Sequence, residues 1–423
     1  MPDLVGYFTI NMKKQVLLFI SLLSFLSTAA QFVDNSYNSW KVMLERKDGK
    51  LVPFILKRKM DKGRTVLYII NANEKILITT VKIAGDSMFF SMPAFESSFR
   101  VKFQPNGDLV GTYIKGTSGN TQYWPLHAYA KMKHRFAELE GDAKNNISGK
   151  WDVSITRANG TIRKALAMFE QKGNKLTGSF LTPAADYRYL EGIVKGDSVF
   201  LSGFDGDNIH LFEAQIINKN KISGGVFYNG YISKETWTAE KNNAVALPEI
   251  SDPTRLRESF KKLDFAFRDL KGNLVSINDE KYKNKVVVIQ LMGSWCANCL
   301  DETRFLSNYY NSDRPKDVEI IALAYELTTD RDRSIKSVAK FQKLFDVKYP
   351  MLITGVTAGD DKKTEKTLPQ LTTIKSFPTT IFLNKNGNVS EIHTEFYGPG
   401  SGEYYIESKN KFYETVKRLL KEQ

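Results

Sequence analysis

The spacing of apolar residues along the chain changes near residue 262. Before that point, short alternating or β-branched runs are separated by turns rich in Gly, Asn and Asp, as in residues 65–70, 87–90 and 198–201. Many strand-length runs at short intervals predict antiparallel strands that form a barrel or sandwich. After residue 262, strand-length runs alternate with stretches of helical spacing, which predicts an α/β unit. We therefore expect a multidomain chain, with antiparallel β modules followed by an α/β domain.

The β region contains an internal repeat. Four landmarks recur at a nearly constant separation, namely residues 40–42 and 151–153, 85–90 and 196–201, 107–113 and 220–226, and Trp124 and Trp237. The first two pairs are 111 residues apart and the last two are 113 apart. A constant offset at four positions is typical of a duplication. The sequence therefore predicts two copies of one β module, in residues 31–130 and 147–240.

Polar segments separate the predicted bodies. Residues 131–146 are a polar linker with a helical run at residues 134–140, and residues 241–262 are a second linker that contains Pro248 and Pro253. Such composition is typical of domain boundaries. The third body, the predicted α/β domain, then occupies residues 263–423.

The second β module opens with a Gly-x-Trp element that ends at Trp151, and Leu-x-Gly elements such as residues 176–178 follow. These short elements resemble the calycin barrels, a group that includes lipocalins and avidins. The resemblance implies a barrel that can hold a small apolar ligand. The same residues equally suit the simple closure of a β fold, and they identify no ligand.

The predicted elements of the α/β domain follow one another along the chain. They are a hairpin at residues 265–277, a strand at 285–291, a helix at 296–311, a strand at 319–324, a helix at 333–345, an insert at 355–368, a strand at 375–383, a return strand at 389–396 and a helix at 408–420. Strands that alternate with helices of this length predict a βαβ unit with parallel pairing. Asn386-Gly387 predicts the hairpin turn that leads into the return strand.

The N-terminus has the pattern of an export signal. Met12-Lys13-Lys14 precedes an apolar stretch at residues 16–26, and the small residues 27–30 follow. The apolar stretch of about 11 residues is shorter than the roughly 20 residues that span a membrane. We therefore predict a signal peptide at residues 1–30, with cleavage after Ala30. Export would bring the chain to the bacterial periplasm or cell envelope, an oxidising compartment.

The composition changes this picture little. The hydrophobic fraction of 42% and the charged fraction of 25% are those of ordinary globular domains. The net charge is +13, but Lys and Arg are spread along the chain among acidic residues. The chain shows no basic stripe with interleaved aromatic residues, so we expect no nucleic-acid partner.

The two cysteines of the chain, Cys296 and Cys299, form the motif Trp-Cys-Ala-Asn-Cys, which begins two residues after the apolar run at 286–292. A thiol in the first turn of a helix ionises readily, because free N–H groups and the helix dipole stabilise the thiolate. The second thiol, one turn later, can resolve a mixed disulfide formed on the first. A structural disulfide across so short a loop would add little stability. The pattern therefore favours a redox dithiol.

No histidine reinforces the cysteine pair as a metal site. None of His127, His134, His210 and His393 falls at metal-ligand spacing with another histidine or with the cysteines. His393 lies in the predicted return strand and is the one candidate for a third ligand, although a surface histidine is the simpler interpretation. We therefore expect no metal and no cofactor.

The C-terminal motifs resemble the thioredoxin superfamily. A Trp-Cys-x-x-Cys motif after a β-branched run is combined with Phe-Pro-Thr-Thr at residues 377–380, an Ile-Phe-Leu strand and an Asn-Gly turn. Within the superfamily, the combination is most similar to the TlpA/ResA-type envelope thiol–disulfide oxidoreductases. The resemblance covers about residues 262–423 and does not extend to the β modules.

The resemblance implies a role for each motif residue. Cys296 would attack a substrate disulfide and Cys299 would resolve the mixed disulfide. Pro378 matches the cis-proline that faces the thiols and leaves the neighbouring backbone free to pair with an extended substrate. Phe377 and Trp295 flank the proline and the first cysteine, and we expect both to contact the substrate.

The sequence departs from the thioredoxin pattern around the dithiol. Thioredoxins carry a buried Asp six residues before the first Cys, and Gln290, which cannot titrate, occupies that position. The TlpA/ResA-type proteins carry a Glu three residues after the second Cys, and this chain has Glu302 there. The resemblance implies that Glu302 accepts the proton of Cys299, while a solvated helix residue is the alternative. Asn298 stands where Pro is frequent, so the redox potential stays open.

Together the residues predict an exported thiol–disulfide oxidoreductase that reduces disulfide-bearing envelope proteins. A thiol–disulfide electron donor at the membrane would reduce the Cys pair again. The choice of reduction over oxidation comes from the resemblance alone. Two other functions are compatible with the sequence. One is a partner- or ligand-binding envelope protein in which the thioredoxin-like domain only docks. The other is a Cu(I) metallochaperone.

Overall fold

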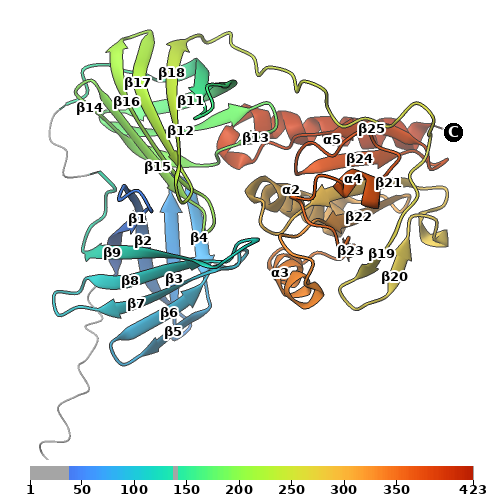
Figure 1. Ribbon diagram of the computed structural model, residues 1–423, viewed down its shortest axis with the longest axis horizontal. Helices are drawn as coiled ribbons and strands as arrows, with labels where there is room; N and C mark the ends of the chain where they lie inside the picture. Colours follow the sequence, from blue (N-terminus) through green and yellow to red (C-terminus); the bar gives the residue numbers. More distant parts are fainter. Residues whose placement is uncertain (1–37, 137–141, 423) are drawn as a thin grey trace, which may run out of the picture.

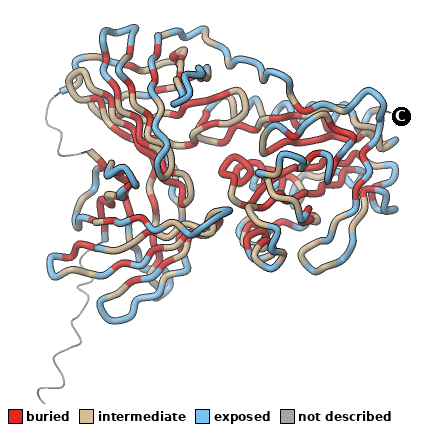
Figure 2. The backbone as a smooth tube through the Cα atoms, viewed as in Figure 1, coloured by how far each residue is buried: buried red, intermediate tan, exposed pale blue. Residues whose placement is uncertain are grey.

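The computed structural model describes residues 38–136 and 142–422, and the predicted signal peptide at residues 1–30 lies outside these ranges. Three bodies can be followed in Figure 1, where two β modules lie one above the other and an α/β domain lies beside them. Buried segments run through the interior of each body in Figure 2. Within the described ranges, no helix is long and apolar enough to cross a membrane.

The first module is an antiparallel meander. In the described part of the chain its nine strands follow the order β4-β3-β2-β1-β9-β8-β7-β6-β5, so β4 and β5 form the two ends of the sheet. The strands are β1 (Ser39–Glu45), β2 (Leu51–Asp61), β3 (Arg64–Asn71), β4 (Glu74–Ile78), β5 (Val81–Ala84), β6 (Ser87–Ser91), β7 (Ser97–Phe103), β8 (Leu109–Lys115) and β9 (Gln122–Ala130). In β9, Trp124, Leu126 and Ala128 are buried, because alternate side chains point to the core.

The second module closes into a barrel. Its strands, all within the described ranges, follow the order β11-β10-β18-β17-β16-β15-β14-β12-β13, and a further pairing of β11 with β12 closes a ring of eight. The short β13 pairs with β12. The strands are β10 (Gly149–Thr156), β11 (Ile162–Lys172), β12 (Lys175–Thr182), β13 (Ala185–Asp186), β14 (Leu190–Lys195), β15 (Ser198–Phe204), β16 (Ile209–Asn218), β17 (Lys221–Asn229) and β18 (Ser233–Lys241).

Aromatic side chains occupy the interior of this barrel. The ring of Phe212 stacks on those of Phe180 and Phe227, with centroids 4.0 Å apart in both pairs. Trp151 and Trp237 are buried in the same core. An eight-stranded barrel has room for its own side chains or for one small ligand. Here side chains lie where the calycin resemblance suggested an apolar ligand.

The two modules share their strand order. Each strand of the second module begins 109 to 112 residues after the strand of the same rank in the first. Trp40 and Trp151 lie on the two first strands, Trp124 and Trp237 lie on the two last strands, and all four are buried. The modules therefore use one scaffold. They differ in that β12 pairs with β14 in the second module, whereas the corresponding β3 and β5 are not paired in the described part of the first.

The segment between the modules is not helical where it is described. Residues 134–136 form bends and coil, and residues 137–140 of the predicted helical run lie outside the described ranges. Arg135 is buried, and its guanidinium donates to the Ser202 carbonyl and to Asn71 Oδ1, both at 2.6 Å. The helix prediction is therefore wrong for residues 134–136, because contacts of Arg135 with both modules outweigh local propensity.

The α/β domain is built on one mixed sheet. Within the described ranges it has seven strands in the order β20-β19-β23-β22-β21-β24-β25. Strands β21, β22 and β23 run parallel, whereas the pairings at both ends of the sheet are antiparallel. The strands are β19 (Ala266–Asp269), β20 (Leu274–Ser276), β21 (Val286–Met292), β22 (Val318–Ala324), β23 (Met351–Ile353), β24 (Thr379–Leu383) and β25 (Val389–His393).

The sheet is covered on both faces. The α-helices of this domain are α2 (Ala297–Asn308), α3 (Arg331–Leu344), α4 (Lys363–Thr367) and α5 (Glu403–Lys421). Along β21, Val288 faces a core that contains Phe305 and Phe412, and its neighbour Ile289 faces a second core that contains Leu371. All seven residues of β21 are buried. Burial of both faces explains why six of the seven residues are apolar, Gln290 being the exception.

The elements follow the predicted order with shifted ends. Helix α2 ends at Asn308 and continues as a π-helical turn, Tyr309–Asp313. The strand predicted at residues 375–383 begins at Thr379, since Pro378 has no N–H to donate to the sheet. Strand β23 was not predicted, because three residues are too few to establish a period.

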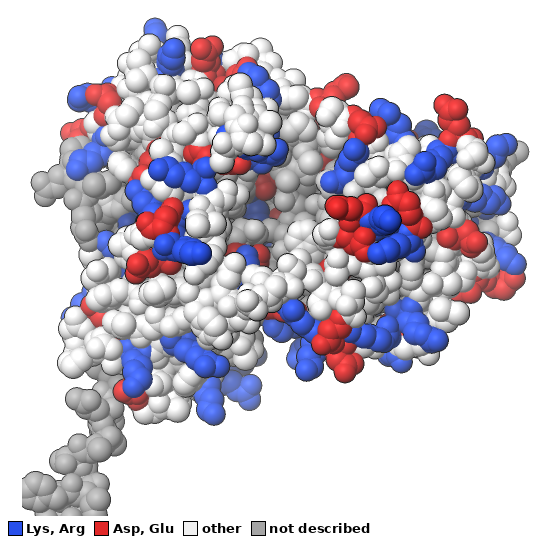
Figure 3. Space-filling model, in the orientation of Figure 1, with Lys and Arg blue, Asp and Glu red and all other residues white. Residues whose placement is uncertain are grey.

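The surface charge is mixed. On the face shown in Figure 3, Lys and Arg side chains are interspersed with Asp and Glu over the β modules and the α/β domain. This pattern agrees with the even distribution of charge along the sequence. Charge alone therefore marks no functional area on this face.

Candidate functional site

The two cysteines lie where strand β21 meets helix α2. Cys296 is the N-cap of α2, and its Sγ accepts a hydrogen bond from the Cys299 N–H at 3.3 Å. A sulfur thus takes the place of the side-chain oxygen that usually caps a helix. The turn before it needs a glycine, because a Cβ on Gly293 would lie 2.2 Å from Trp295 Nε1. The local sequence therefore places the Cys299 N–H where it can donate to the sulfur of Cys296.

Both thiols are free and buried, with Cys296 8% exposed and Cys299 fully buried. The Cys296 thiol lies 3.4 Å from the carbonyl oxygen of Phe377. Burial raises the pKa of the Cys299 thiol well above its ordinary value, and the hydrogen bond with Cys296 and the charge of Glu302 raise this pKa further. Cys299 therefore keeps its proton until an acceptor removes it, which suits the thiol that reacts second.

The residues expected to contact substrate lie together beside Cys296. The Phe377–Pro378 peptide bond is cis. The ring of Trp295 packs edge-on against Phe377 with centroids 5.9 Å apart, and its Nε1 donates to the Tyr325 carbonyl at 2.8 Å. Trp295 and Phe377 are half-buried, whereas Pro378 is buried. The structure thus brings the predicted motif residues to one place.

Glu302 is buried under the dithiol. Its Oε2 accepts from Gln290 Nε2 at 2.7 Å, and its Oε1 accepts from Thr380 Oγ1 at 2.6 Å. Burial raises the pKa of Glu302 to about 7, although both hydrogen bonds lower it. The alternative of a solvated helix residue is wrong, because Glu302 is only 3% exposed. A carboxyl whose pKa lies near neutral pH is suited to accept and release protons.

A second buried carboxyl, Glu326, was missed in the sequence. It accepts from the Ser294 N–H at 2.9 Å and from Ser294 Oγ at 2.6 Å, and burial raises its pKa to about 7. Glu326 thereby holds the turn that leads to Cys296. It lies two residues after the end of β22, which runs parallel to β21. Parallel strands bring their carboxyl ends to the same edge of a sheet. The position of Glu326 just after β22 could therefore have predicted that it lies near the turn after β21.

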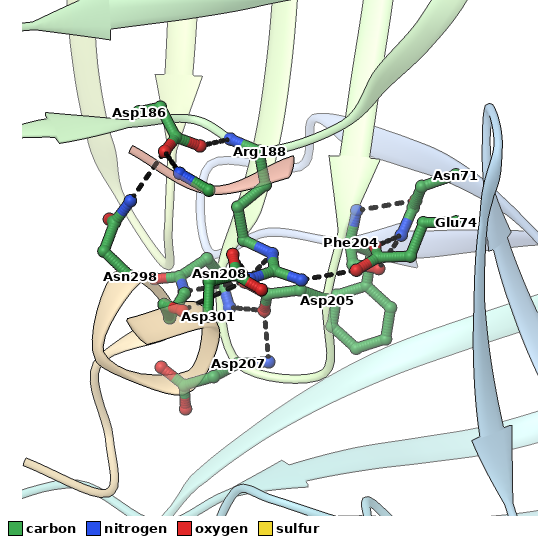
Figure 4. Close-up of polar contacts among 12 residues, drawn as sticks. Asn71, Glu74, Asp186, Arg188, Phe204, Asp205, Asp207, Asn208, Asn298 and Asp301 are labelled. Atoms are coloured by element: carbon green, nitrogen blue, oxygen red, sulfur yellow. Dashed lines mark hydrogen bonds and ion pairs between the residues drawn. The ribbon is translucent and has the colours of Figure 1, made fainter. Parts of the chain in front are cut away.

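The barrel also reaches the site, through residues that no motif marks. Asp186 Oδ2 accepts from Asn298 Nδ2 at 2.9 Å, and Arg188 donates to the Ala297 carbonyl at 3.2 Å and to the carboxylate of Asp301. Figure 4 shows these side chains converging on the first turn of α2. Both residues between the two cysteines are therefore hydrogen-bonded to the barrel.

His393 is not a surface residue, contrary to the sequence interpretation. It is 9% exposed, its ring packs on Phe382 at 4.7 Å, and its Nε2 lies 2.9 Å from Glu391. The histidine is therefore engaged by its own strand and by the sheet. Among the residues that the structure describes, no group of three His, Cys, Asp or Glu side chains is arranged to hold a metal ion.

Comparisons with known proteins agree with this geometry. Residues 249–403 match the Redoxin family model. The thiol–disulfide oxidoreductase ResA of Bacillus cereus strain ATCC 10987 is 28% identical over 171 residues, which cover 40% of this chain and 79% of that protein. ResA of Bacillus thuringiensis subsp. konkukian is 31% identical over 126 residues, or 30% of this chain and 63% of that protein.

Similar solved structures include one from Bacteroides thetaiotaomicron. A putative protein disulfide isomerase from Bacteroides thetaiotaomicron is 18% identical, covers 40% of this chain and 95% of its own, and has a TM-score of 0.29. The residues that the family model matches, 249–403, include Cys296, Cys299, Glu302 and Pro378. The C-terminal domain of this chain is thus a ResA/TlpA-type member of the thioredoxin superfamily, a thiol–disulfide oxidoreductase domain.

Proposed function

We propose that this protein is an exported oxidoreductase that reduces disulfides of envelope proteins through Cys296 and Cys299. The observation that carries the proposal is the placement of Cys296 at the start of α2, with Cys299 one turn later and the Phe377–Pro378 bond beside it. Cys299 lies behind Cys296, where it can reach a disulfide formed on that residue.

The reaction exchanges one disulfide for another. The Cys296 thiolate attacks one sulfur of the substrate disulfide, forms a mixed disulfide and releases the other substrate sulfur as a thiolate, which takes up a proton. Cys299 then attacks Cys296 Sγ and releases the second substrate thiol. Two electrons pass from the dithiol to the substrate, and the protein is left with a Cys296–Cys299 disulfide. A thiol–disulfide electron donor at the membrane would reduce it again.

Glu302 is the proposed acceptor for the proton of Cys299. The thiol cannot attack while it is protonated, and its raised pKa makes help from a base necessary. Glu302 lies three residues after Cys299 on α2, so the two side chains are on the same face of the helix. Its own pKa of about 7 allows it to alternate between the two protonation states.

Trp295, Phe377 and Pro378 are the proposed substrate-contact residues. Trp295 and Phe377 form a half-buried aromatic pair next to Cys296. Such a pair offers an apolar surface to a polypeptide that approaches the sulfur. The export signal predicted at residues 1–30 supports a location in the bacterial periplasm or cell envelope.

Two variants test this function. Cys296→Ser is expected to abolish reduction of insulin and of small model disulfides, and full activity in this variant would refute the assignment. Cys299→Ser is expected to hold substrates on Cys296 as mixed disulfides, which can be isolated from the cell envelope. If Cys299→Ser trapped no envelope protein while insulin was still reduced by the native chain, a docking role of the domain would explain the chain better.

A further inference from the structure

The first turn of the active-site helix is held by the barrel. Asp186, in β13, accepts from Asn298 Nδ2 at 2.9 Å and from the Gly398 N–H at 2.6 Å. Arg188, two residues later, donates to the Ala297 carbonyl and to Asp301. The contacted groups follow Cys296 directly or lie in the loop after β25. The barrel therefore covers the side of Cys296 on which α2 begins.

Arg188 joins all three bodies of the molecule. Besides Asp301 of the thioredoxin-like domain, its guanidinium binds Glu74 of the first module and lies 3.9 Å from Asp205 of the barrel. Figure 4 shows this guanidinium between carboxylates from three directions. One cation thus faces three carboxylates, and every side chain of this set is nearly buried. Such a cluster is a poor source of stability, because desolvation offsets the attraction between the charges.

The backbone at Arg188 is adapted to this contact. Its backbone φ of 53° lies in the left-handed region, which residues other than glycine rarely adopt. Asp186 Oδ1 holds this conformation by accepting the Arg188 N–H at 2.7 Å. Opposite, a Cβ on Gly400 would lie 2.7 Å from the Arg188 carbonyl carbon, so only glycine lets the two loops approach so closely. Strained backbone and close approach indicate that the contact serves more than simple packing.

The first module holds the same domain at a second point. Glu96 accepts from Arg333 Nε at 2.8 Å and from Ser337, both on helix α3. Phe95 next to it is buried in the core cluster that contains Cys296. The barrel therefore contacts the domain at α2, and the first module contacts it at α3. Apolar contacts accompany these polar ones, since Phe95 packs into the core of the domain and Leu166 and Leu181 of the barrel pack with Tyr397.

This arrangement leaves little of the reactive turn accessible. Cys296, Ala297 and Asn298 are 8%, 9% and 7% exposed. A disulfide of a protein client must bring one sulfur to about 2 Å from Cys296 Sγ to form the mixed disulfide. A folded client carries backbone on both sides of its disulfide and therefore meets the barrel loop that covers the start of α2.

We propose that Asp186 and Arg188 are specificity-determining residues, which close a cover over Cys296 that protein clients must displace. The proposal rests on the proposed function in naming protein clients. With the cover closed, small disulfides reach Cys296 past Trp295 and Phe377. Large clients react after the Arg188–Asp301 and Asp186–Asn298 contacts have opened. The β modules thereby select which disulfides are reduced.

Alkylation of Cys296 tests the cover without relying on turnover. In the full chain carrying Cys299→Ser, Cys296 is the one thiol left, and its rates of reaction with iodoacetamide and with a maleimide-linked polyethylene glycol are measured. Arg188→Gln is expected to raise the rate with the large reagent at least tenfold, and the rate with iodoacetamide by less. The matched control is Arg157→Gln, an arginine of the same barrel that is half-exposed and pairs with Glu235. Equal rates in the two variants would overturn the proposal.

A milder variant guards against misfolding. Glu74→Gln removes one partner of the same guanidinium and leaves Asp301 in place. It is expected to raise the rate with the large reagent about threefold, at an unchanged melting temperature, and an unchanged rate would also contradict the cover. A general loss of packing would instead speed both reagents equally and lower the melting temperature, and that result would overturn the proposal too. Insulin reduction that persisted in Cys296→Ser would refute the proposed function while the alkylation rates still reported on the cover.

Discussion

Gln290 Nε2 donates a hydrogen bond to Glu302 Oε2 over 2.7 Å. Gln290 lies on β21 and Glu302 on α2, so the bond joins the strand before the dithiol to the helix after it. Gln290 stands where thioredoxins carry a buried Asp, and Glu302 stands where the TlpA/ResA-type proteins carry a Glu. In three dimensions they form one unit, in which a side chain that cannot titrate orients a carboxyl that can. The proton acceptor proposed for Cys299 has thus moved from the strand to the helix.

The first prediction concerns the pH dependence of resolution. Glu302→Gln removes the base, so attack by Cys299 should require a higher pH and should slow at least tenfold at pH 7. The measurement is release of the second thiol from a mixed disulfide formed on Cys296, followed as a function of pH. Glu319→Gln is the matched control, since Glu319 is a buried carboxyl bound to Lys285 and Arg314. An identical pH profile in Glu302→Gln would remove the proposed role.

A second prediction concerns the hydroxyl that binds Glu302. Thr380→Val removes the donor to Oε1, and this hydrogen bond lowers the pKa of Glu302. A hydrogen bond to a charged group contributes about 1.5 kcal/mol, so the pH profile of resolution should move up by about one pH unit. Thr379→Val is the control, because the Thr379 hydroxyl donates to the Ser376 carbonyl instead. A shift of the same size in both variants would argue against a specific effect on Glu302.

The third prediction is a pH dependence of stability. Burial raises the pKa of Glu302 from 4.5 to about 7, and the charge of Glu395 raises it as well, so the folded state binds this proton more tightly than the unfolded state. The stabilising effect of protonation is complete below pH 4.5 and is lost as the pH rises through 7. The loss is on the order of 3 kcal/mol.

Urea unfolding at several pH values measures this effect. Other buried carboxyls, Glu326 and Asp186 among them, also have raised pKa values and act in the same direction. The comparison is therefore the difference between the native chain and Glu302→Gln. The free energy of unfolding of the native chain should fall relative to the variant between pH 4.5 and pH 7. A difference that does not change with pH would contradict burial of an ionisable Glu302.

A fourth prediction concerns the turn before the dithiol. Gly293→Ala places a methyl group 2.2 Å from Trp295 Nε1, so the indole must move and lose its bond to the Tyr325 carbonyl. We expect the free energy of unfolding to fall by about 1–3 kcal/mol. The rate of insulin reduction should fall as well, because Trp295 lies beside Cys296. Thermal unfolding and an activity assay measure both. Gly359→Ala, where a Cβ would meet open space, is the control.

Much of this protein was determined by the sequence alone. The duplication, the order of elements in the α/β domain and the dithiol motif were readable, because they depend on spacing and on residue type within short segments. The run at residues 286–292, apolar except for Gln290, predicted a strand, and all seven of its residues are buried. Trp295 and Cys299 were identified as site residues because they lie in the same short motif as Cys296.

The tertiary structure alone decided what lies against that motif. Glu302 is buried and bound by Gln290 and Thr380, which is a property of the packed core rather than of its helix. Arg188 lies more than one hundred residues before Cys296, and its contacts with Asp301 and Glu74 depend on how three bodies dock. Local patterns report on faces and turns, whereas docking depends on side chains from distant segments. The motif therefore indicates the chemistry, and the packing of the β modules against it determines how Cys296 is approached.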